Sequence, residues 1–362
     1  MICGALAVLF LSLMCVPFYG KYKLGVAEKE WVGENGFGWK TTAEEVSEGV
    51  DMSGQVALVT GANSGLGFEN ARVFALRGAH VVLVARSLAK AEDAIEKIKA
   101  LLPAGKTSTM TALACDLGDL KSVDAAAKAF KEKGLPLHYL IANAGIMALP
   151  QRKTTADGLE MQVGTNHIGH FHLIVSLIDV LVKSQPARVV VVSSCAHEQS
   201  PNPKAFLTSD DLDMPYRPWH TYANSKLSNI VFAKELNERY KSKGVLAFSL
   251  HPGIIETNLA RSMEQSALLD LVFGRDMAFD FPRFAPVFGR TIPQGTATQV
   301  YAALKAPESE AGMYLSNCNV EGFGKTYPQK DSGLLDSPAV RAKLWATSEK
   351  IVQKALKKSG IY

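Results

Sequence analysis

The most constraining stretch of this chain runs from Gln55 to Gly67 and reads QVALVTGANSGLG. Its first half, Val56 to Val59, is a short apolar run that predicts a strand buried on both faces of a parallel sheet. Its second half is rich in glycine, and an apolar pattern with helical spacing follows from Phe68 to Leu76. The stretch therefore predicts a strand, a glycine-rich turn and the beginning of a helix.

This unit indicates a dinucleotide-binding site. Glycines in the turn would allow tight bending, a close approach to a pyrophosphate and close packing of the helix on the strand. The unpaired N–H groups at the start of the helix would face the phosphate charge. We assign these turn residues to the cofactor: Gly61, Asn63, Ser64, Gly65, Leu66 and Gly67. Three nearby glycines alone would also suit an ordinary turn, so the assignment depends on the rest of the chain.

The spacing T-G-x-x-x-G-x-G from Thr60 to Gly67 differs from the general G-x-G-x-x-G pattern and resembles the short-chain dehydrogenase/reductase family. The resemblance extends from about Met52 to Leu315, with its motifs in family order. It implies an α/β fold of the Rossmann type, with a doubly wound, seven-stranded parallel sheet. Apolar runs predict further strands at His80–Ala85, Thr109–Ala114, Leu137–Ala142, Arg188–Ser193, Val245–Leu250 and Gly312–Leu315.

The end of the second predicted strand indicates which nicotinamide dinucleotide binds. An acid there would bind the adenosine ribose and repel a 2′-phosphate, but this chain has Ala85 followed by Arg86. A guanidinium can pair with a phosphate, so we expect NADP(H) rather than NAD(H). The alternative is that Arg86 is a solvated residue at a helix start. Asp116, followed by Leu117, resembles the family's adenine-contacting aspartate and is equally suited to cap a helix.

Two more segments resemble family motifs that contact the cofactor. Small residues that would lie against the ribose follow the fourth strand: Asn143, Ala144 and Gly145. A Pro-Gly turn that would lie beside the nicotinamide follows the sixth strand, and the resemblance assigns the carboxamide and phosphate to residues just after it: Pro252, Gly253, Ile255 and Thr257.

Tyr222 and Lys226 are spaced as i and i+4, so on a helix they lie on one face. A nearby cation, here Lys226 together with an oxidised nicotinamide ring, favours the phenolate and would let Tyr222 exchange a proton with a substrate oxygen. The alternative is an exposed helix pair, since this spacing is common. The order and distance after the glycine loop resemble the family's catalytic pair.

Two more candidates complete a catalytic tetrad. Ser194, at the end of the fifth strand, resembles the family serine that holds the substrate oxygen. Ser193 is its competitor, because neighbouring residues of a strand point to opposite faces; we choose Ser194. Asn166 resembles the helix asparagine that positions a water between Lys226 and solvent.

His167 and His170 flank this asparagine, but no cysteine or carboxylate cluster accompanies them. We expect packing or surface histidines and no metal. The five cysteines are scattered, an odd set that suits a reducing compartment.

The N-terminal segment Ile2–Gly20 is apolar and uncharged and is about the shortest helix that can cross a bilayer. We expect an uncleaved anchor, with a removed signal peptide or a buried helix as alternatives. Lys21 and Lys23 follow and favour a cytoplasmic catalytic domain, on the endoplasmic reticulum or another organelle membrane; signal cleavage would instead give a secreted protein. The predicted organisation is an anchor (1–20), a linker with a short helix (21–51) and the catalytic domain (52–362).

In the linker, Thr41 is the predicted N-cap of the short helix. Trp31 and Trp39 suit either a membrane interface or a cap on the globular domain. The net charge of +4 is too small to indicate nucleic-acid binding. The oligomeric state stays open, a homodimer being one option.

Two features resemble the retinol dehydrogenase branch, which includes the dehydrogenase part of the WW-domain oxidoreductase and chloroplast-envelope relatives. One is the long insertion Cys195–Thr221, and the other is N-H-x-G-H-F around Asn166. The aromatic-rich segment 259–292 predicts an apolar substrate lid or a bilayer contact, with an ordinary packed lid as the alternative.

We therefore expect an oxidoreductase that interconverts a lipophilic alcohol and its aldehyde or ketone, of the retinoid, steroid or fatty aldehyde type, with NADP(H). Reduction is the expected direction in a cytoplasm that keeps the cofactor reduced. A membrane-associated NADP(H) sensor with little turnover is the main alternative. A light-dependent protochlorophyllide reductase shares the glycine loop and the Tyr/Lys pair, but the long insertion argues against it.

Overall fold

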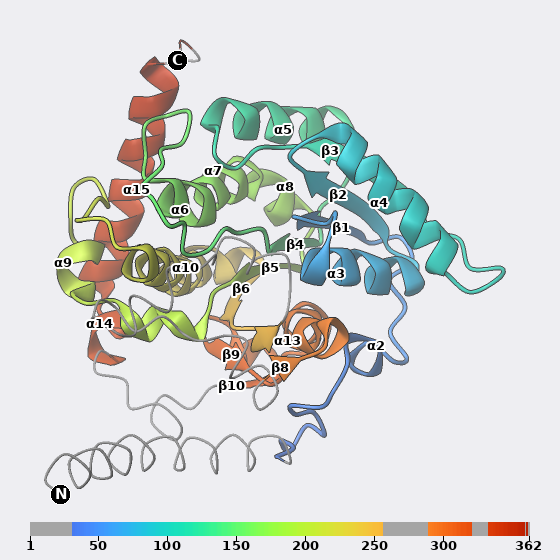
Figure 1. Ribbon diagram of the computed structural model, residues 1–362. Helices are drawn as coiled ribbons and strands as arrows, with labels where there is room; N and C mark the ends of the chain where they lie inside the picture. The colour runs from blue at the N-terminus through green and yellow to red at the C-terminus, as the bar shows by residue number, and fades with distance from the viewer. Residues whose placement is uncertain (1–30, 256–288, 321–331, 359, 361–362) are drawn as a thin grey trace, which may run out of the picture.

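A twisted sheet of eight strands, in the order β10-β9-β6-β5-β4-β1-β2-β3, forms the centre of the molecule (Figure 1). The computed structural model describes residues 31–255, 289–320, 332–358 and 360. The strands of this sheet are β1 Val56–Thr60, β2 His80–Ala85, β3 Met110–Ala114, β4 Tyr139–Ala142, β5 Ala187–Val192, β6 Val245–Leu250, β9 Tyr314–Ser316 and β10 Asn319–Val320.

Seven of these strands run parallel, and the eighth, β10, pairs antiparallel with β9. The prediction of a doubly wound Rossmann-type fold is thus confirmed, with one short antiparallel edge strand that we did not expect. Asn317 and Cys318 connect β9 to β10 with φ angles of 53° and 59°. Two successive positive φ angles are typical of the tight turns that join antiparallel strands. No glycine marks this turn, so its position could not be recognised from residue types.

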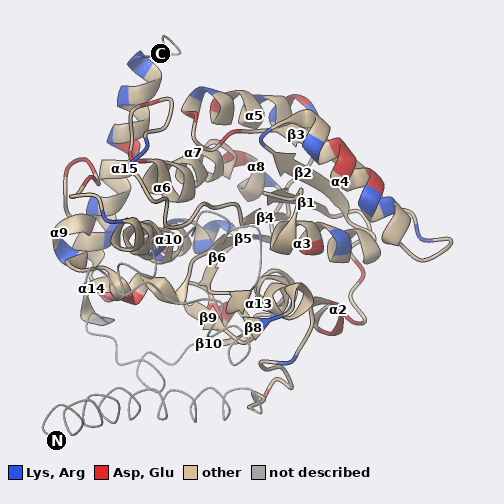
Figure 2. Ribbon diagram, viewed as in Figure 1, with Lys and Arg blue, Asp and Glu red and all other residues tan. Residues whose placement is uncertain are grey.

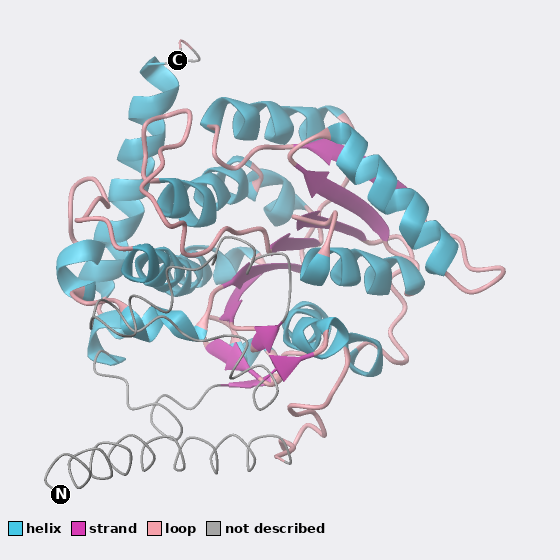
Figure 3. Ribbon diagram, in the orientation of Figure 1, coloured by secondary structure: helices cyan, strands magenta, loops and turns pink. Residues whose placement is uncertain are grey.

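Helices cover both faces of the sheet (Figures 1 and 3). In β1, Val56 and Leu58 belong to the core under one helical layer, whereas Ala57 and Val59 belong to the core under the other. Both faces of the sheet are therefore buried from solvent, which explains the continuous apolar runs of the strands. One layer contains α5 Leu120–Glu132, α7 Gly169–Ser176, α10 Pro218–Tyr240 and α15 Pro338–Lys358. The other contains α2 Ala43–Val46, α3 Gly65–Leu76, α4 Leu88–Leu101 and α13 Ile292–Leu304.

Charged residues lie mainly on the outer helices, where Figure 2 shows both signs interspersed, for example along α4. The central strands carry few of them.

The remaining short helices of the described chain are α6 Met161–Val163, the π-helix η1 Gly164–Ile168, α8 Ile178–Lys183, η2 Cys195–Gln199, α9 Pro203–Leu207, η3 Lys241–Lys243, η5 Glu308–Glu310 and α14 Ser332–Asp336.

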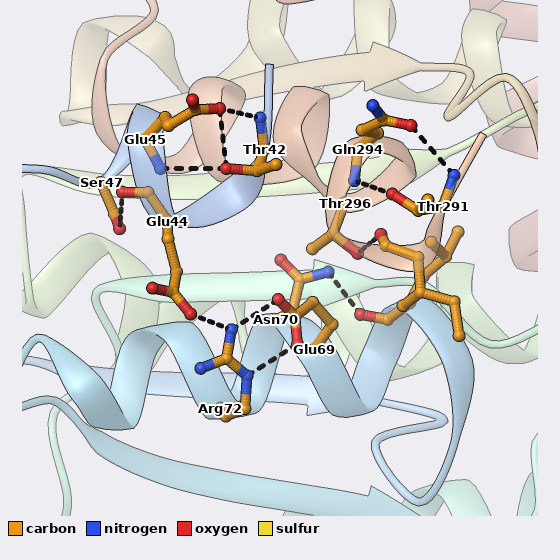
Figure 4. Close-up of polar contacts among 12 residues, drawn as sticks. Thr42, Glu44, Glu45, Ser47, Glu69, Asn70, Arg72, Thr291, Gln294 and Thr296 are labelled. Atoms are coloured by element: carbon orange, nitrogen blue, oxygen red, sulfur yellow. Dashed lines mark hydrogen bonds and ion pairs between the residues drawn. The ribbon is translucent and has the colours of Figure 1, made fainter. Parts of the chain in front are cut away.

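The short helix predicted in the linker is α2, and its N-cap is Thr42, so the assignment to Thr41 was wrong by one residue. Thr42 and Glu45 form a reciprocal capping box (Figure 4). The hydroxyl of Thr41 instead accepts a hydrogen bond of 2.9 Å from the Gly38 N–H, which draws it away from the helix. Glu44 of α2 pairs with Arg72 of α3, so the helix is fastened to the dinucleotide-binding unit (Figure 4).

The two linker tryptophans differ in their surroundings. Trp39 is buried, and the guanidinium of Arg290 lies 4.0 Å from the centre of its ring. Trp31 is 49% exposed. Trp39 therefore caps the globular domain, which was one of the two options for these residues.

Several predictions fall on residues outside the described ranges. These are the anchor at 1–20, Thr257 and most of the lid segment, 259–288. Residues 289 and 290 form β8 (Gly289–Arg290), which pairs in parallel with β7 (Ile254–Ile255). Among the helices that the structure describes, none has the length and apolar character needed to span a bilayer.

Candidate active site

The candidate site lies at the carboxyl edge of the sheet, where the strand order changes direction. The chain runs outward from β1 through β2 to β3, and then returns to β4 on the other side of β1. Ligands of doubly wound sheets bind at this kind of switch point. The glycine loop, Asn143, Ser194 and Pro252 follow β1, β4, β5 and β6 respectively, so the topology brings these predicted residues to one edge.

The glycine loop has the shape that a dinucleotide phosphate requires. Gly61 adopts a φ of +67°, in the left-handed region that favours glycine. A Cβ on Gly67 would lie 2.4 Å from the Gly61 carbonyl oxygen, so a larger residue could not start α3 there. Asn63 and Ser64 are exposed at the N-terminus of this helix. The loop therefore fits the pyrophosphate of a nicotinamide dinucleotide.

Thr60 joins the glycine loop to the strand beside it. Its hydroxyl oxygen accepts hydrogen bonds from the main-chain N–H groups of Asn143 (2.9 Å) and Ala144 (3.0 Å). In addition, Asn143 Nδ2 donates a hydrogen bond of 2.9 Å to the Thr60 carbonyl oxygen. The ends of β1 and β4 are thereby held together beneath the position expected for the cofactor ribose.

The adenine end of the site is formed by residues that follow β2 and β3. Arg86 is exposed directly after β2. Asp116 is also exposed, and its Oδ1 accepts a bond of 2.9 Å from the Gly118 N–H. The N-cap of α5 is Asp119, not Asp116, because the Asp119 carboxylate accepts from the N–H groups of Lys121 and Ser122. Leu117 is buried in the core, which leaves its backbone as the part able to reach a cofactor.

Tyr222 and Ser194 face each other in the structure. Tyr222 is buried on α10, and its hydroxyl is hydrogen-bonded to the Ser194 side chain. Ser193 points the other way, since its Oγ donates a bond of 2.7 Å to the main-chain oxygen of Lys226. The geometry agrees with the choice of Ser194 over Ser193, while the catalytic role of Ser194 stays a prediction.

Burial controls the protonation of the Tyr/Lys pair. It raises the pKa of Tyr222 above that of an ordinary phenol, and the hydrogen bond from Ser194 opposes the rise only in part. It also lowers the pKa of the Lys226 ammonium, to about 8. The lowering of the Tyr222 pKa that we expected from Lys226 together with an oxidised nicotinamide ring stays a prediction. At neutral pH the phenol is the proton-bearing form.

Lys226 and Asn166 meet at Gly145. A Cβ on Gly145 would lie 3.3 Å from Asn166 Oδ1 and 3.5 Å from Lys226 Nζ. Lys226 Nζ also lies 5.7 Å from the centre of the Tyr222 ring. Gly145 therefore leaves room for both polar side chains directly beneath the candidate ribose position, and the four predicted catalytic residues are neighbours.

Asn166 lies in the π-helix η1, a local widening that often occurs at functional sites. Its side chain bonds both main-chain polar groups of Ile146, at 2.9 Å each. Its Nδ2 also donates to Ser225 Oγ at 3.0 Å, and that hydroxyl donates to the Tyr222 carbonyl oxygen. The asparagine thus connects the segment after β4 to the helix that carries Tyr222.

The predicted nicotinamide end is partly described. Pro252, Gly253 and Ile255 are half-buried between β6 and β8. The Gly253 N–H donates to His251 Nδ1 at 3.1 Å. A Cβ on Gly253, where φ is +92°, would lie 2.6 Å from Arg290 Nε. Only glycine fits this turn without strain.

Three residues beside the site were not assigned from the sequence. Thr60 and His170 join the site by mutual contact, with 2.9 Å between Thr60 Oγ1 and His170 Nε2. Gln299 of α13 donates to Asn143 Oδ1 at 3.3 Å. Thr60 and His170 belong to motifs that we singled out, which was a usable signal, whereas nothing around Gln299 marks it. Among the described residues, no three His, Cys, Asp or Glu side chains gather as a metal site would require.

Comparisons with known proteins identify the family. A family profile described as short chain dehydrogenase matches residues 55–267. The human WW domain-containing oxidoreductase is 39% identical over 323 residues, covering 87% of this chain and 72% of that protein. Human retinol dehydrogenase 12 is 38% identical over 270 residues, covering 74% of this chain and 79% of that protein.

Solved structures share the fold. A putative uncharacterized protein from Mycobacterium paratuberculosis matches with a TM-score of 0.60 and 28% identity, over 85% of this chain and 97% of that one. L-Sorbose reductase from Gluconobacter frateurii, complexed with NADPH and L-sorbose, matches with a TM-score of 0.55 and 18% identity, over 74% of this chain and 97% of that one. The family profile and the relatives' identities together show that the chain belongs to the short-chain dehydrogenase/reductase family of oxidoreductases.

Proposed function

We propose that this protein is an NADP(H)-dependent oxidoreductase that interconverts a lipophilic alcohol and its aldehyde or ketone. The observation that carries the proposal is the buried Tyr222 hydroxyl bonded to Ser194, with Lys226 close behind it. This arrangement lies at the carboxyl edge of the sheet, beside a loop shaped for a dinucleotide.

Each residue of the tetrad has a role in carbonyl reduction. The cofactor, when bound, supplies the hydride that adds to the carbonyl carbon. Tyr222 donates its phenolic proton to the carbonyl oxygen, which becomes the alcohol oxygen, and Ser194 orients that oxygen. Lys226 holds the cofactor ribose through its ammonium, and Asn166 supports the return of a proton from solvent. The raised pKa of Tyr222 keeps its hydroxyl protonated at neutral pH, which is the form that reduction requires.

Arg86 supports NADP(H) as the cofactor. It follows β2 as an exposed side chain, at the position where a carboxylate would select NAD(H). A guanidinium there is available to pair with the 2′-phosphate. The structural relative L-sorbose reductase is described as complexed with NADPH, which is consistent with this choice.

The substrate class rests on two observations. One of the relatives is named a retinol dehydrogenase, which suggests a lipophilic alcohol and carbonyl pair, of the retinoid, steroid or fatty aldehyde type, for this chain. The second is the apolar segment 2–20, the proposed anchor, which would place the domain on the cytoplasmic side of the endoplasmic reticulum or another membrane. A substrate dissolved in the bilayer would then reach the site directly.

Isotope transfer tests this proposal. Membranes from cells that express the full chain are given deuteride-labelled NADPH or NADH with retinal, steroid ketones and long-chain aldehydes, and products are analysed by mass spectrometry. Label from NADPH that disappears in Tyr222→Phe is the expected result, and it names the substrate class. Measurable NADPH binding without label in any product would instead favour the NADP(H) sensor.

A further inference from the structure

His170 bridges the two halves of the candidate site. It is the second residue of α7, and 1% of its surface is exposed. Its Nδ1 lies 3.0 Å from the Asn166 carbonyl oxygen, and its Nε2 lies 2.9 Å from Thr60 Oγ1. One imidazole ring thus contacts both the helix that presents Asn166 and the hydroxyl that holds the N–H groups of Asn143 and Ala144.

The hydrogen-bond partners determine which ring nitrogen of His170 carries the proton. A hydroxyl has one proton and two lone pairs, and two main-chain N–H groups already donate to Thr60 Oγ1. Thr60 must therefore donate its proton, and His170 Nε2 at 2.9 Å is a closer acceptor than the Ile141 oxygen at 3.3 Å. The Asn166 carbonyl can only accept, so Nδ1 of His170 bears the hydrogen.

The surroundings keep this ring neutral. Burial is the main cause that lowers the pKa of His170, and with the smaller effects of the Asn166 bond, which raises it, and the Lys226 charge, which lowers it, the pKa is about 4. A neutral ring can donate at one nitrogen and accept at the other, as the Asn166 and Thr60 contacts require. An imidazolium would present a second donor to Thr60, whose lone pairs are occupied.

His167 is a matched contrast on the same segment. It is also fully buried, but its Nε2 lies 2.9 Å from Ser348 Oγ of α15, and that hydroxyl lies equally close to the Leu344 oxygen. The single proton of Ser348 can go to either acceptor, so these contacts do not fix the tautomer of His167, whereas the partners of His170 fix one form. Its other neighbours are the rings of Phe171 and Phe232, away from the glycine loop. His167 packs against the C-terminal helix α15.

We propose that His170 is a positioning residue. In its neutral Nδ1–H form it connects Thr60, which holds the N–H groups of Asn143 and Ala144, to the π-helix η1, which carries Asn166. It holds Asn166 beside Gly145, close to Lys226. The residues of the proton relay and those beneath the cofactor ribose are thereby fixed relative to each other. This inference rests on the proposed function, because it assigns His170 to the proton relay of that site.

The tautomer is measured by nitrogen NMR of the full chain labelled at histidine, with His170→Asn and His167→Leu used to assign the two resonances. We expect Nδ1–H for His170 at pH 7. Adding NADPH should shift the His170 signals more than those of His167. An Nε2–H or doubly protonated His170, or a His170 signal insensitive to NADPH that binds, overturns the proposal.

Kinetics separate positioning from packing. In His170→Leu, Thr60 can donate to Ile141 instead, so the protein should fold, but kcat should fall about tenfold or more through misplacement of the relay, with the Kd for NADPH changed little. His170→Asn keeps a donor to the Asn166 oxygen and should restore most of kcat. His167→Leu should lower the melting temperature and leave kcat unchanged. Equal kcat values for His170→Leu and wild type would contradict the proposal.

The two readouts distinguish this inference from the proposed function. If the wild-type protein reduces no carbonyl compound, the proposed function fails and the kinetic test with it. The tautomer and its response to NADPH then decide whether His170 still connects Thr60 to the π-helix that carries Asn166. If turnover is found but the tautomer is the wrong one, the function stands and the role of His170 falls.

Discussion

The Lys226 ammonium donates a hydrogen bond of 3.0 Å to the main-chain oxygen of Val192, at the carboxyl end of β5. The same oxygen accepts from Asn229 Nδ2 at 3.1 Å. A fully buried cation held by a shared carbonyl is costly to the fold, which is why burial lowers its pKa to about 8. The position of Lys226 is therefore set by the needs of the site rather than by stability.

Replacing this lysine should stabilise the protein and abolish turnover. The folded pKa of Lys226, about 8, lies below its ordinary value of 10.5, so the unfolded chain binds this proton more tightly. The loss of stability that buried Lys226 causes is complete below pH 8 and decreases as the pH rises towards 10.5. Lys226→Met should raise the free energy of unfolding at pH 7 by about 1–3 kcal/mol in urea titrations. Lys97→Met, which removes an exposed cation paired with Asp93, should change it by less than about 0.5 kcal/mol.

Removing the Tyr222 hydroxyl should lower kcat/KM by about 10²–10⁴-fold, because the general acid is lost, with NADPH binding retained. Turnover is followed by NADPH absorbance with the best substrate of the panel. Tyr139→Phe is the matched control, since its hydroxyl bonds Gln55 Oε1 at the opposite edge of the sheet. Similar losses in both variants would argue against Tyr222 as the acid.

Replacing each of the two adjacent serines should have a different effect: the Ser194 variant should lose activity, and the Ser193 variant should lose stability. Ser194→Ala should reduce kcat about tenfold or more, since the substrate oxygen loses a hydrogen bond. Ser193→Ala should keep kcat near the wild-type value and lower the free energy of unfolding by about 1 kcal/mol, because its bond to the Lys226 oxygen is lost. The reverse pattern in paired kinetic and urea measurements would exchange their roles.

Arg86→Asp should change the cofactor preference. A carboxylate after β2 would repel the 2′-phosphate and bind the ribose hydroxyl instead. The Kd for NADPH should rise about tenfold or more, while the Kd for NADH falls, both measured by calorimetry. Exposed Lys90→Asp, on the outside of α4, carries the same charge change as a control. Unchanged affinities in Arg86→Asp would mean that Arg86 is only a solvated residue at a helix start.

Acidification should destabilise the protein through its two fully buried histidines. The folded pKa is about 3 for His167 and about 4 for His170, against 6.5 for an ordinary histidine. Between pH 6.5 and 5 the unfolded chain therefore binds more protons, and stability falls by up to about 1.4 kcal/mol per pH unit for each ring. Urea titrations at pH 7, 6 and 5 measure this slope. His80, His138 and His172, whose pKa values burial also lowers, add to the slope, so His167→Leu should reduce it by up to about 1.4 kcal/mol per pH unit and not abolish it; an equal slope in the variant would show that other groups cause it.

The parts of the fold that were predictable depend on local signals. The glycine loop, the buried strands and the face shared by Tyr222 and Lys226 follow from spacing along the chain, and each appears where expected. The N-caps at Thr42 and Asp119 were misplaced because neighbouring residues offer similar side chains, and only the bonds formed in the fold distinguish them.

Contacts between distant segments could not be derived in this way. Thr60 and His170 are separated by 110 residues, and neither motif indicates that the hydroxyl and the imidazole would meet. The edge strand β10 depends on left-handed backbone at Asn317 and Cys318, which residue type alone does not specify. Burial of Tyr222 also depends on the whole fold, so the rise in pKa that burial causes could not be derived from the sequence.

The segment that precedes α2 bears on how the protein can be handled outside the cell. Asn35 Nδ2 donates to the Cys318 oxygen at 2.7 Å, and Asn319 Nδ2 donates to the Phe37 oxygen at 3.2 Å, so this segment lies against the turn and the start of β10. Unprotected edge strands recruit strands from neighbouring molecules and lead to aggregation. A shortened protein that begins at Met52, where the family resemblance starts, would lose this cover and the buried Trp39 together. Versions trimmed for crystallisation or NMR should therefore keep the chain from residue 31 onward.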